Sequence, residues 1–276
     1  MNTKAKPKSG LAAMEIKVFD VDGQELRTAI RKGTSSRPPL MMFNGIGANL
    51  ELARPFIEQL DDTTAIIFDV PGVGGSPAPG FPYRPSTLAR LAKRLGEILG
   101  YDRMDISGVS WGGGLAQQFA FQYPSVCRKL ILAATAPGFT MVPGKPNVLS
   151  KMASPRRYTD PGYLRSIAPD IYGGAFRTDP TLIGKHAAAM KGATQYGYML
   201  QLLAMSGWTS LPWLWLLRQP TLILSGNDDP LVPMINAKMM HQMISKSRLE
   251  VIDDGHLFMV TKPRETAEII EGFLRE

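Results

Sequence analysis

The sequence predicts an α/β protein with a mostly parallel central sheet, helices on both faces, and a helical cap inserted late in the chain. The first observation is that short, wholly apolar strands alternate with segments of helical apolar spacing. Such strands are typical of parallel sheets, because crossover helices bury them on both faces. The second is a Gly-x-Ser-x-Gly motif directly after one strand, and the third is a break in the alternation over 137–219.

Length, charge and cysteine content limit the class of protein. The 276 residues suit one large domain, or a domain with an insertion, and the net charge is +7. Part of that charge lies in a polar tail, 1–13, which we expect to be disordered and basic. Elsewhere the basic residues are dispersed, which argues against nucleic-acid binding. The tail lacks the apolar segment of a signal peptide, so secretion is not expected. The single Cys127 excludes an internal disulfide, is compatible with the cytoplasm, and is expected to be inert and partly buried.

The elements of the first half follow one another in a regular order. Two strands, 15–19 and 25–31, are joined by a turn at Asp22-Gly23. Apolar residues at helical spacing predict a helix over 87–99. The elements expected around it are strand 40–43, helix 50–60, strand 64–68, strand 104–107, helix 110–123 and strand 130–134.

The alternation resumes after the break and completes the core. The last elements expected are strand 221–225, helix 234–244, strand 248–252 and helix 263–274. The interrupting segment is too long for a loop and has helical spacing in pieces. We therefore predict a core formed by 14–136 and 220–276, and a helical cap formed by 137–219.

The cap contains an uncharged stretch, 192–217, which we interpret as part of a substrate cleft. Gln195, Gln201, Gly207 and Pro212 interrupt it, so a transmembrane segment is not expected. A cap must bury one apolar face and can present another to a ligand. The expected substrate-binding residues are Met199, Leu203, Trp208, Trp213 and Trp215.

Ser110 is the candidate nucleophile. It is the middle residue of Gly108-Val109-Ser110-Trp111-Gly112, at the junction of a strand and a helix. A serine there occupies a sharp, strained turn that lifts its hydroxyl clear of the sheet. Side chains at the two flanking glycines would collide with the neighbouring strand or helix. The alternative is a structural turn, since the motif alone recurs by chance in loops.

His256 is the candidate base among the three histidines. A serine hydroxyl needs a base to take its proton, and histidine is the usual one. His256 directly follows the last predicted strand, and chemistry on an open parallel sheet gathers at the carboxyl ends of strands. His186 is expected on the surface of the cap, and His241 in the middle of a helix.

The acid of the site should follow strand 221–225. A carboxylate between serine and histidine in chain order would orient the imidazole. Asp228 and Asp229 both qualify by position. Hydrolases of this layout usually read Gly-x-x-Asp-x-x-(Val/Ile)-Pro here, which favours Asp229 and leaves Asp228 as a turn or capping residue.

Backbone amides should stabilise the developing oxyanion. We expect one from Trp111, just after the nucleophile, and one from Ile46, in the loop after strand 40–43. Gly45 and Gly47 flank Ile46 and allow an unusual backbone path. This chemistry requires no metal and no organic cofactor.

These residues resemble the α/β-hydrolase superfamily across about 15–276, including the loop DVPGVGGS (69–76). Asn44 departs from it, because a His-Gly pair is common there. The chain is more closely similar to the intracellular medium-chain-length polyhydroxyalkanoate depolymerases. The matching segments are FNGIGANLEL (43–52), FDVPGVGGS (68–76), GVSWGGGLAQQFA (108–120), MVPGKPNVL (141–149), MASPRRY (152–158), IYGGAFRTDP (171–180), GWTS (207–210) and DDGHLF (253–258).

That resemblance implies the α/β-hydrolase fold with a helical cap and a triad of Ser110, Asp229 and His256. It also implies a cytoplasmic enzyme on storage granules that hydrolyses medium-chain 3-hydroxyacyl polyesters. The expected partner is a polyester granule surface or a hydrophobic acyl ester.

Three other functions remain to be weighed. A polyester synthase of similar architecture carries cysteine at the elbow, whereas position 110 is serine. A small-molecule carboxylesterase or perhydrolase would use the same triad. A granule-coat protein with a vestigial site would need no complete triad.

Overall fold

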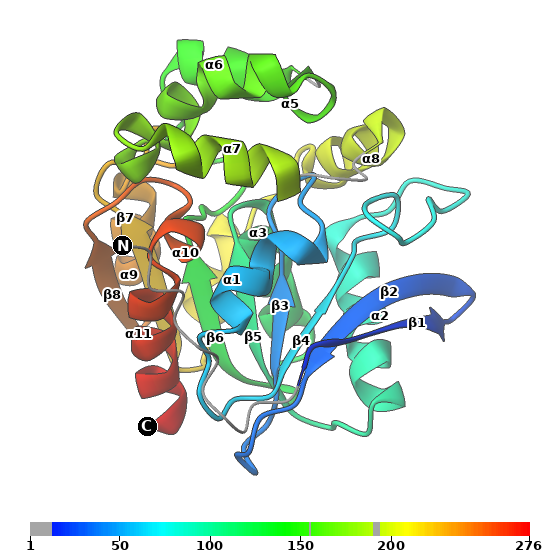
Figure 1. The fold of residues 1–276 in the computed structure, drawn as a ribbon. Helices are drawn as coiled ribbons and strands as arrows, with labels where there is room; N and C mark the ends of the chain where they lie inside the picture. Colours follow the sequence, from blue (N-terminus) through cyan, green and yellow to red (C-terminus); the bar gives the residue numbers. More distant parts are fainter. Residues whose placement is uncertain (1–12, 155, 190–193) are drawn as a thin grey trace.

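The computed structural model describes residues 13–154, 156–189 and 194–276 (Figure 1). Within them, eight strands form one sheet in the order β1-β2-β4-β3-β5-β6-β7-β8. The pairs β1–β2 and β2–β4 are antiparallel, and every later pair is parallel. The predicted basic tail, apart from Ala13, lies outside the described residues.

Each strand overlaps one that the apolar runs predict. Both residues of the Asp22-Gly23 turn have positive φ, 54° and 82°. Cys127, at the start of β6, is fully rather than partly buried, and burial raises the pKa of its thiol. The strands are β1 (Glu15–Val21), β2 (Gln24–Arg31), β3 (Leu40–Phe43), β4 (Ala65–Phe68), β5 (Met104–Val109), β6 (Cys127–Ala133), β7 (Thr221–Gly226) and β8 (Ser247–Ile252).

Helices cover both faces of the sheet, as its fully buried, apolar strands β3 and β4 require. In β3, Met41 and Phe43 pack with α2 (Pro85–Ile98), α3 (Trp111–Gln122) and α9 (Ile235–Met243). The alternate residues Leu40 and Met42 pack on the other face with α1 (Arg54–Ile57), α10 (Phe258–Thr261) and α11 (Pro263–Arg275). The sheet therefore contributes to a separate core on each side.

The helix predicted over 50–60 is shorter than expected. A 3-10 helix, η1 (Leu50–Ala53), leads into α1, which begins at Arg54 and ends at Ile57. Pro55 has no N–H, so a continuous α-helix through this point would lack the bond to Glu51. Proline is tolerated in the first turn, which is where α1 places it.

A helical insertion, which we define as residues 134–220, separates β6 from β7. Its helices α6, α7 and α8 lie beyond one end of the sheet in Figure 1. The core shared by α6 and α7 includes Leu231 and Val232 from the loop after β7, so the insertion packs directly on that loop. The insertion contains α4 (Pro146–Ala153), α5 (Arg156–Thr159), α6 (Pro161–Tyr172), η2 (Gly174–Arg177), α7 (Pro180–Ala189), α8 (Gln195–Met205) and η3 (Leu211–Leu216).

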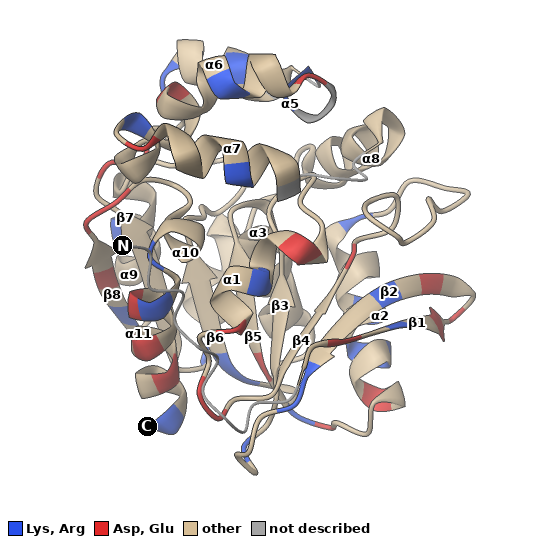
Figure 2. Ribbon diagram, in the orientation of Figure 1, with Lys and Arg blue, Asp and Glu red and all other residues tan. Residues whose placement is uncertain are grey.

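Charged residues are unevenly spread over the helices. Figure 2 shows none in α8, whereas α11 carries both signs of charge along its length. Among the described helices, none combines the length and the apolar character needed to cross a membrane.

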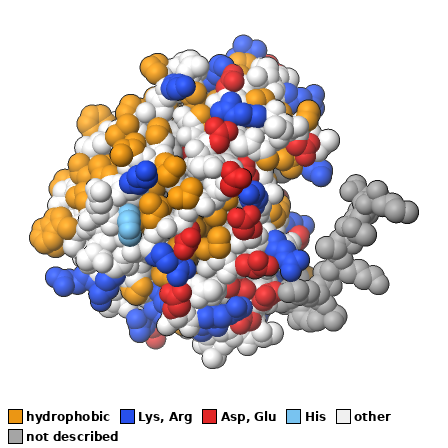
Figure 3. Space-filling model, turned by 90° about the vertical axis from the view of Figure 1, so that its left-hand side faces the viewer, with side chains coloured by type: hydrophobic (Ala, Val, Ile, Leu, Met, Phe, Trp, Pro, Cys, Tyr) orange, Lys and Arg blue, Asp and Glu red, His pale blue; other side chains and the backbone are white. Residues whose placement is uncertain are grey.

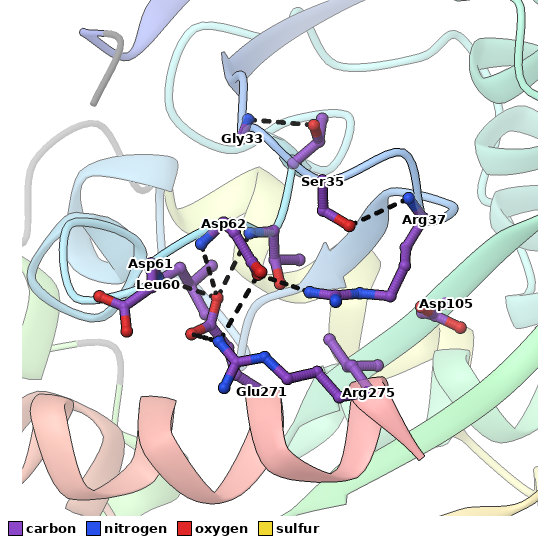
Figure 4. A network of polar contacts seen from close by, with 12 residues as sticks. Gly33, Ser35, Arg37, Leu60, Asp61, Asp62, Asp105, Glu271 and Arg275 are labelled. Atoms are coloured by element: carbon purple, nitrogen blue, oxygen red, sulfur yellow. Dashed lines mark hydrogen bonds and ion pairs between the residues drawn. The ribbon is translucent and has the colours of Figure 1, made fainter. Parts of the chain in front are cut away.

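One buried carboxylate joins the last helix to the loop before β4. The Glu271 side chain accepts hydrogen bonds from the backbone N–H groups of Asp61, Asp62 and Thr63 at 2.9, 3.1 and 3.3 Å (Figure 4). Its second oxygen accepts one from Arg275 at 3.1 Å. Glu271 is nearly inaccessible to solvent, so without it these backbone donors would lose a charged acceptor in a buried place.

We expect Glu271→Ala to lower the free energy of unfolding by about 3 kcal/mol, because buried donors would be left unsatisfied. Urea denaturation of the two proteins measures this difference. Glu268→Ala is the matched control: Glu268 lies on the exposed side of the same helix, bonded to Arg264, and its loss should change stability by less than about 0.5 kcal/mol. Equal effects of the two substitutions would contradict this role for Glu271.

Candidate active site

Ser110 occupies a strained backbone position between β5 and α3. Its φ is 53° and its ψ is −118°, a conformation that non-glycine residues rarely adopt. Such strain costs on the order of 1–3 kcal/mol and persists only where the surroundings impose it. Here the Ser110 N–H donates to the Ala133 carbonyl at 2.9 Å, and the Ser110 carbonyl accepts from the Thr135 hydroxyl at 2.6 Å. The turn is therefore held from the adjacent strand β6.

The flanking glycines are required by close backbone contacts. A Cβ at Gly108 would lie 2.1 Å from the Gly112 carbonyl oxygen, in the first turn of α3. A Cβ at Gly112 would lie 2.3 Å from the Phe43 carbonyl oxygen, at the end of β3. Neither place has room for a methyl group, as the collision argument predicts.

His256 and Asp229 form a buried pair. The His256 Nδ1 lies 2.7 Å from Asp229 Oδ2. The other carboxylate oxygen accepts the N–H groups of Leu231 and Val232 at 2.9 and 2.8 Å, which fixes the plane of the carboxylate. Since a carboxylate can only accept, Nδ1 carries the proton and Nε2 of the neutral ring is left as an acceptor.

Asp228 points elsewhere and is exposed. Its carboxylate accepts from the Gly174 N–H at 2.7 Å and from Arg177 Nε at 2.8 Å. The Arg177 guanidinium holds the pKa of Asp228 below its usual value. This carboxylate caps the start of η2 and pairs with an arginine, as expected of a turn or capping residue.

Backbone contacts attach the His256 loop to the helical insertion. The His256 N–H donates to the Tyr172 carbonyl, at the end of α6, at 2.7 Å. A Cβ at Gly255 would lie 2.0 Å from that same oxygen, so only glycine allows the approach. Asp254 accepts from the Ala175 N–H at 2.8 Å and from the Gly255 N–H at 2.7 Å. The insertion thus helps to position the candidate base.

Ser110 and His256 line one cavity, which we call the first cavity. The loop after β3 contributes Gly45 and Ile46, and a Cβ at Gly45 would lie 3.7 Å from the Ser110 Cβ. Three polar residues of the insertion also line this cavity. Its lining is Met42, Asn44, Gly45, Ile46, Ala48, Leu52, Ala53, Phe56, Val109, Ser110, Met152, Arg157, Tyr172, His186, His256, Leu257, Met259 and Val260.

A second cavity meets the first at Ile46, Ser110 and Met152, and is lined almost entirely by apolar residues. It also contains Trp111, the first residue of α3, whose N–H cannot be satisfied within its own helix. The rest of its lining is Gly114, Thr135, Ala136, Gly138, Phe139, Met141, Leu149, Tyr198, Leu202, Met205, Trp208, Leu231 and Val232.

The loop that holds Ile46 is fixed on both sides. Gly47 N–H donates to the Gln201 side-chain oxygen at 2.7 Å, which connects this loop to α8. Asn44 donates through Nδ2 to the Asn49 carbonyl at 2.7 Å. The side chain that departs from the common pattern at position 44 therefore braces its own loop.

One of the five residues expected to bind substrate, Trp208, lines the second cavity together with Ser110. Met199, Leu203 and Trp215 are 56%, 47% and 62% exposed and line neither cavity. Trp213 also lies outside both linings and stacks on Phe121, with ring centroids 4.4 Å apart.

The rotation of α8 about its axis explains why Met199 and Leu203 do not line the second cavity. Tyr198, Leu202 and Met205 line the second cavity and follow the i, i+4, i+7 pattern of one helix face. Met199 and Leu203 are each one residue further along, so they are rotated by about 100° away from it.

His186 is buried rather than on the surface, so that expectation is wrong. It is 6% exposed, because its ring packs edge-on against those of Tyr172 and Phe176, at 5.2 and 5.6 Å. Burial, together with the charge of Arg157, lowers the pKa of His186 to about 4. The sequence did not lead us to expect Arg157, Tyr172 and His186 in a cavity. The one sequence feature that could have pointed to them is that Arg157 and Tyr172 lie in two of the segments that resemble the depolymerases, 152–158 and 171–180.

Comparisons with known proteins agree with this architecture. The family model of the alpha/beta hydrolase fold matches residues 38–263. A poly(3-hydroxyalkanoate) depolymerase of Ectopseudomonas oleovorans is 53% identical over 261 residues, covering 94% of this chain and 92% of that protein. A 3-oxoadipate enol-lactonase of Acinetobacter baylyi is 24% identical over 246 residues, covering 88% and 91%. The crystal structure of the enol-lactonase from Burkholderia xenovorans superposes with a TM-score of 0.80 at 20% identity, covering 94% and 100%.

The pKa of His186 makes stability depend on pH. In the unfolded chain a histidine has a pKa of about 6.5, so on acidification the unfolded state takes up a proton before the folded state does. Stability is therefore lost as the pH falls from about 6.5 towards 4. Between pH 7 and pH 5 the unfolding free energy should fall by about 2 kcal/mol more in the natural protein than in His186→Phe. Urea denaturation at both pH values measures this, and an equal fall in the two proteins would refute it.

Proposed function

The chain belongs to the alpha/beta hydrolase family and, within it, to the poly(3-hydroxyalkanoate) depolymerases, and we propose that it hydrolyses medium-chain-length poly(3-hydroxyalkanoates) through Ser110, His256 and Asp229. It is a carboxylic ester hydrolase. One observation carries the assignment of residues: His256, which lies 2.7 Å from the buried Asp229, lines the cavity that also holds the strained Ser110.

The first step forms an acyl-enzyme. The free Nε2 of His256 removes the proton of Ser110 as its Oγ attacks the ester carbonyl. Asp229 stabilises the imidazolium that results and keeps the ring oriented. The amides of Ile46 and Trp111 would donate hydrogen bonds to the negative oxygen. The C–O bond then breaks, and the leaving alcohol takes its proton from His256.

The second step releases the acyl group. A water molecule gives its proton to His256 and attacks the acyl carbonyl, and the same two amides stabilise the oxyanion again. Collapse of this intermediate returns the proton to Ser110 and frees the carboxylic acid. The overall reaction consumes one ester bond and one water and yields an acid and an alcohol.

The substrate class is supported by the apolar second cavity. It opens at the surface, because two of its lining residues, Phe139 and Leu202, are 76% and 45% exposed. Leu202 lies on α8, which carries no charged residue (Figure 2). Figure 3 shows that hydrophobic side chains also gather over one part of the outer surface. A hydrophobic polyester chain can enter at such a rim and reach Ser110 between the two cavities.

The proposal extends to organisation and location. We assign 14–136 and 220–276 to a catalytic core and 137–219 to a cap that acts as a lid over Ser110. The enzyme would act in the cytoplasm, on the surface of polyester storage granules. The depolymerase activity of the Ectopseudomonas oleovorans relative supports the polyester, and the resemblance described above supports the medium chain length and the location.

Ser110→Ala should reduce ester hydrolysis by roughly 10⁵-fold or more, because no other group can form the acyl-enzyme. It should also abolish covalent labelling by a fluorophosphonate, while the circular dichroism spectrum stays that of the natural protein. Hydrolysis within tenfold of the natural rate would refute the role of Ser110.

The neighbouring aspartates offer a matched pair for the third triad member. Asp229→Asn should lower kcat by roughly 10⁴-fold, because the amide no longer holds the productive tautomer of His256. Asp228→Asn, one residue away and bonded to Gly174 and Arg177, should change kcat by less than about threefold. A larger loss of kcat in Asp228→Asn than in Asp229→Asn would instead assign the orientation of His256 to Asp228.

The rim of the second cavity should matter more for particles than for small esters. Phe139→Asp should lower the rate on suspended polyester particles at least about tenfold, while hydrolysis of a short nitrophenyl ester changes by less than about threefold. Phe81→Asp is the control, since Phe81 is 86% exposed but lines neither cavity. Equal losses in the two variants on particles would contradict entry at this rim.

A further inference from the structure

Three polar side chains of the helical insertion lie in the first cavity, on segments that are far apart in sequence. Arg157 comes from α5, Tyr172 from the end of α6 and His186 from α7. All three are more than nine-tenths buried. None has a part in the ester hydrolysis described above, so their presence beside Ser110 needs another explanation.

The three groups are close enough to interact. Tyr172 Oη lies 3.4 Å from His186 Nε2. Burial raises the pKa of Tyr172, while a hydrogen bond from Arg157 and its charge act in the opposite direction. The Arg157 guanidinium also lies over the Tyr198 ring, 5.4 Å from its centroid. The cluster is therefore a packed unit.

The direction of these hydrogen bonds follows from the chemistry of the groups. Arginine can only donate, so in any contact with the Arg157 guanidinium the Tyr172 oxygen would be the acceptor. The Tyr172 hydroxyl hydrogen is then available for His186 Nε2, which leaves the proton of the neutral ring on Nδ1. Within the described structure, His186 Nδ1 is buried and makes no hydrogen bond. A buried donor without an acceptor is costly, and a ligand oxygen would supply one.

The rest of the first cavity would favour a negative ligand. The described residues of its lining include no aspartate or glutamate, and Arg157 is their one permanently charged group. None of these lining residues is exposed, in contrast to the rim of the second cavity. A carboxylate matches a guanidinium in charge and in hydrogen-bond geometry, and a low-polarity surrounding strengthens that contact.

We propose that Arg157, with Tyr172 and His186, binds the free carboxylate of the polyester chain end, so that the terminal unit occupies the first cavity. This inference rests on the proposed function. The remainder of the chain then lies in the apolar second cavity, which opens at the surface. The ester bond between the last two units lies where the two cavities meet, at Ser110.

The bond changes are those of ester hydrolysis with a defined leaving group. Ser110 Oγ bonds to the carbonyl carbon of the penultimate unit, and its proton passes to His256. The bond from that carbon to the ester oxygen of the terminal unit breaks, and this oxygen takes the proton from His256. The terminal 3-hydroxy acid leaves with its carboxylate intact. Water then releases the shortened chain, whose new carboxylate is a ligand for the next cycle.

The test compares two soluble trimers of a medium-chain 3-hydroxy acid, one with a free terminal carboxylate and one capped as its N-methylamide. The natural enzyme should cleave the free acid with a kcat/KM roughly 10- to 100-fold higher, the factor expected for a charged hydrogen bond. With the carboxyl-terminal unit labelled by ¹³C, the first product should be the labelled monomer.

Two matched variants test whether Arg157 causes the preference for the trimer with a free carboxylate. Arg157→Met should remove it by lowering kcat/KM for the free acid alone. Arg156→Met should keep it, because Arg156 is exposed and pairs with Asp160 at 3.0 Å. Should Arg157→Met fail to fold, the comparison of the two trimers by the natural enzyme still decides.

Two results would overturn the carboxylate site: equal kcat/KM for both trimers, or a preference that survives in Arg157→Met. Either would leave the proposed function standing, because both trimers are polyesters. If neither trimer were cleaved while a short nitrophenyl ester was, the proposed function would be wrong and this inference with it.

Discussion

The backbone turn at Ser110 is the constraint on which the rest of the structure depends. It can form only if α3 starts directly against the end of β3, where Gly112 meets the Phe43 carbonyl. That contact places β5 beside β3 in the middle of the sheet and brings the loop of Ile46 to the start of α3. The strain is balanced by backbone and hydroxyl bonds from β6. The geometry around Ser110 is thus set by main-chain sterics rather than by its own side chain.

Sequence alone could predict the sheet and the candidate residues of the proposed triad because both leave direct signals. Strands buried on both faces are mostly apolar. Ser110 and Asp229 follow such strands, β5 and β7, whereas His256 follows the half-buried edge strand β8. The lining of the cavities could not be predicted in the same way. Helix α8 has no charged residue to mark an outer face, so its orientation is set by tertiary packing. His186 gave no sign of burial, because the rings that cover it come from another helix.

The two cavities differ in chemistry although they share Ser110. One is apolar and opens through exposed side chains, whereas the other is enclosed and contains the Arg157, Tyr172 and His186 cluster. A symmetric apolar groove would accept an ester in either direction. An asymmetric pair would give the substrate a preferred direction, because only the first cavity contains a buried guanidinium that a carboxylate can bind. Direction of binding is a property that the core fold by itself does not provide.

The bonds between the insertion and the His256 loop limit how this enzyme can be recombined with its relatives. The Tyr172 carbonyl holds the His256 amide, and Asp254 holds the Ala175 amide, so two chain segments from either side of β7 share one backbone network. A graft of a foreign insertion that changed the backbone path over 172–175 would displace the base even if every residue of the core were kept. In evolution, the end of α6 must therefore be inherited together with the loop that it supports.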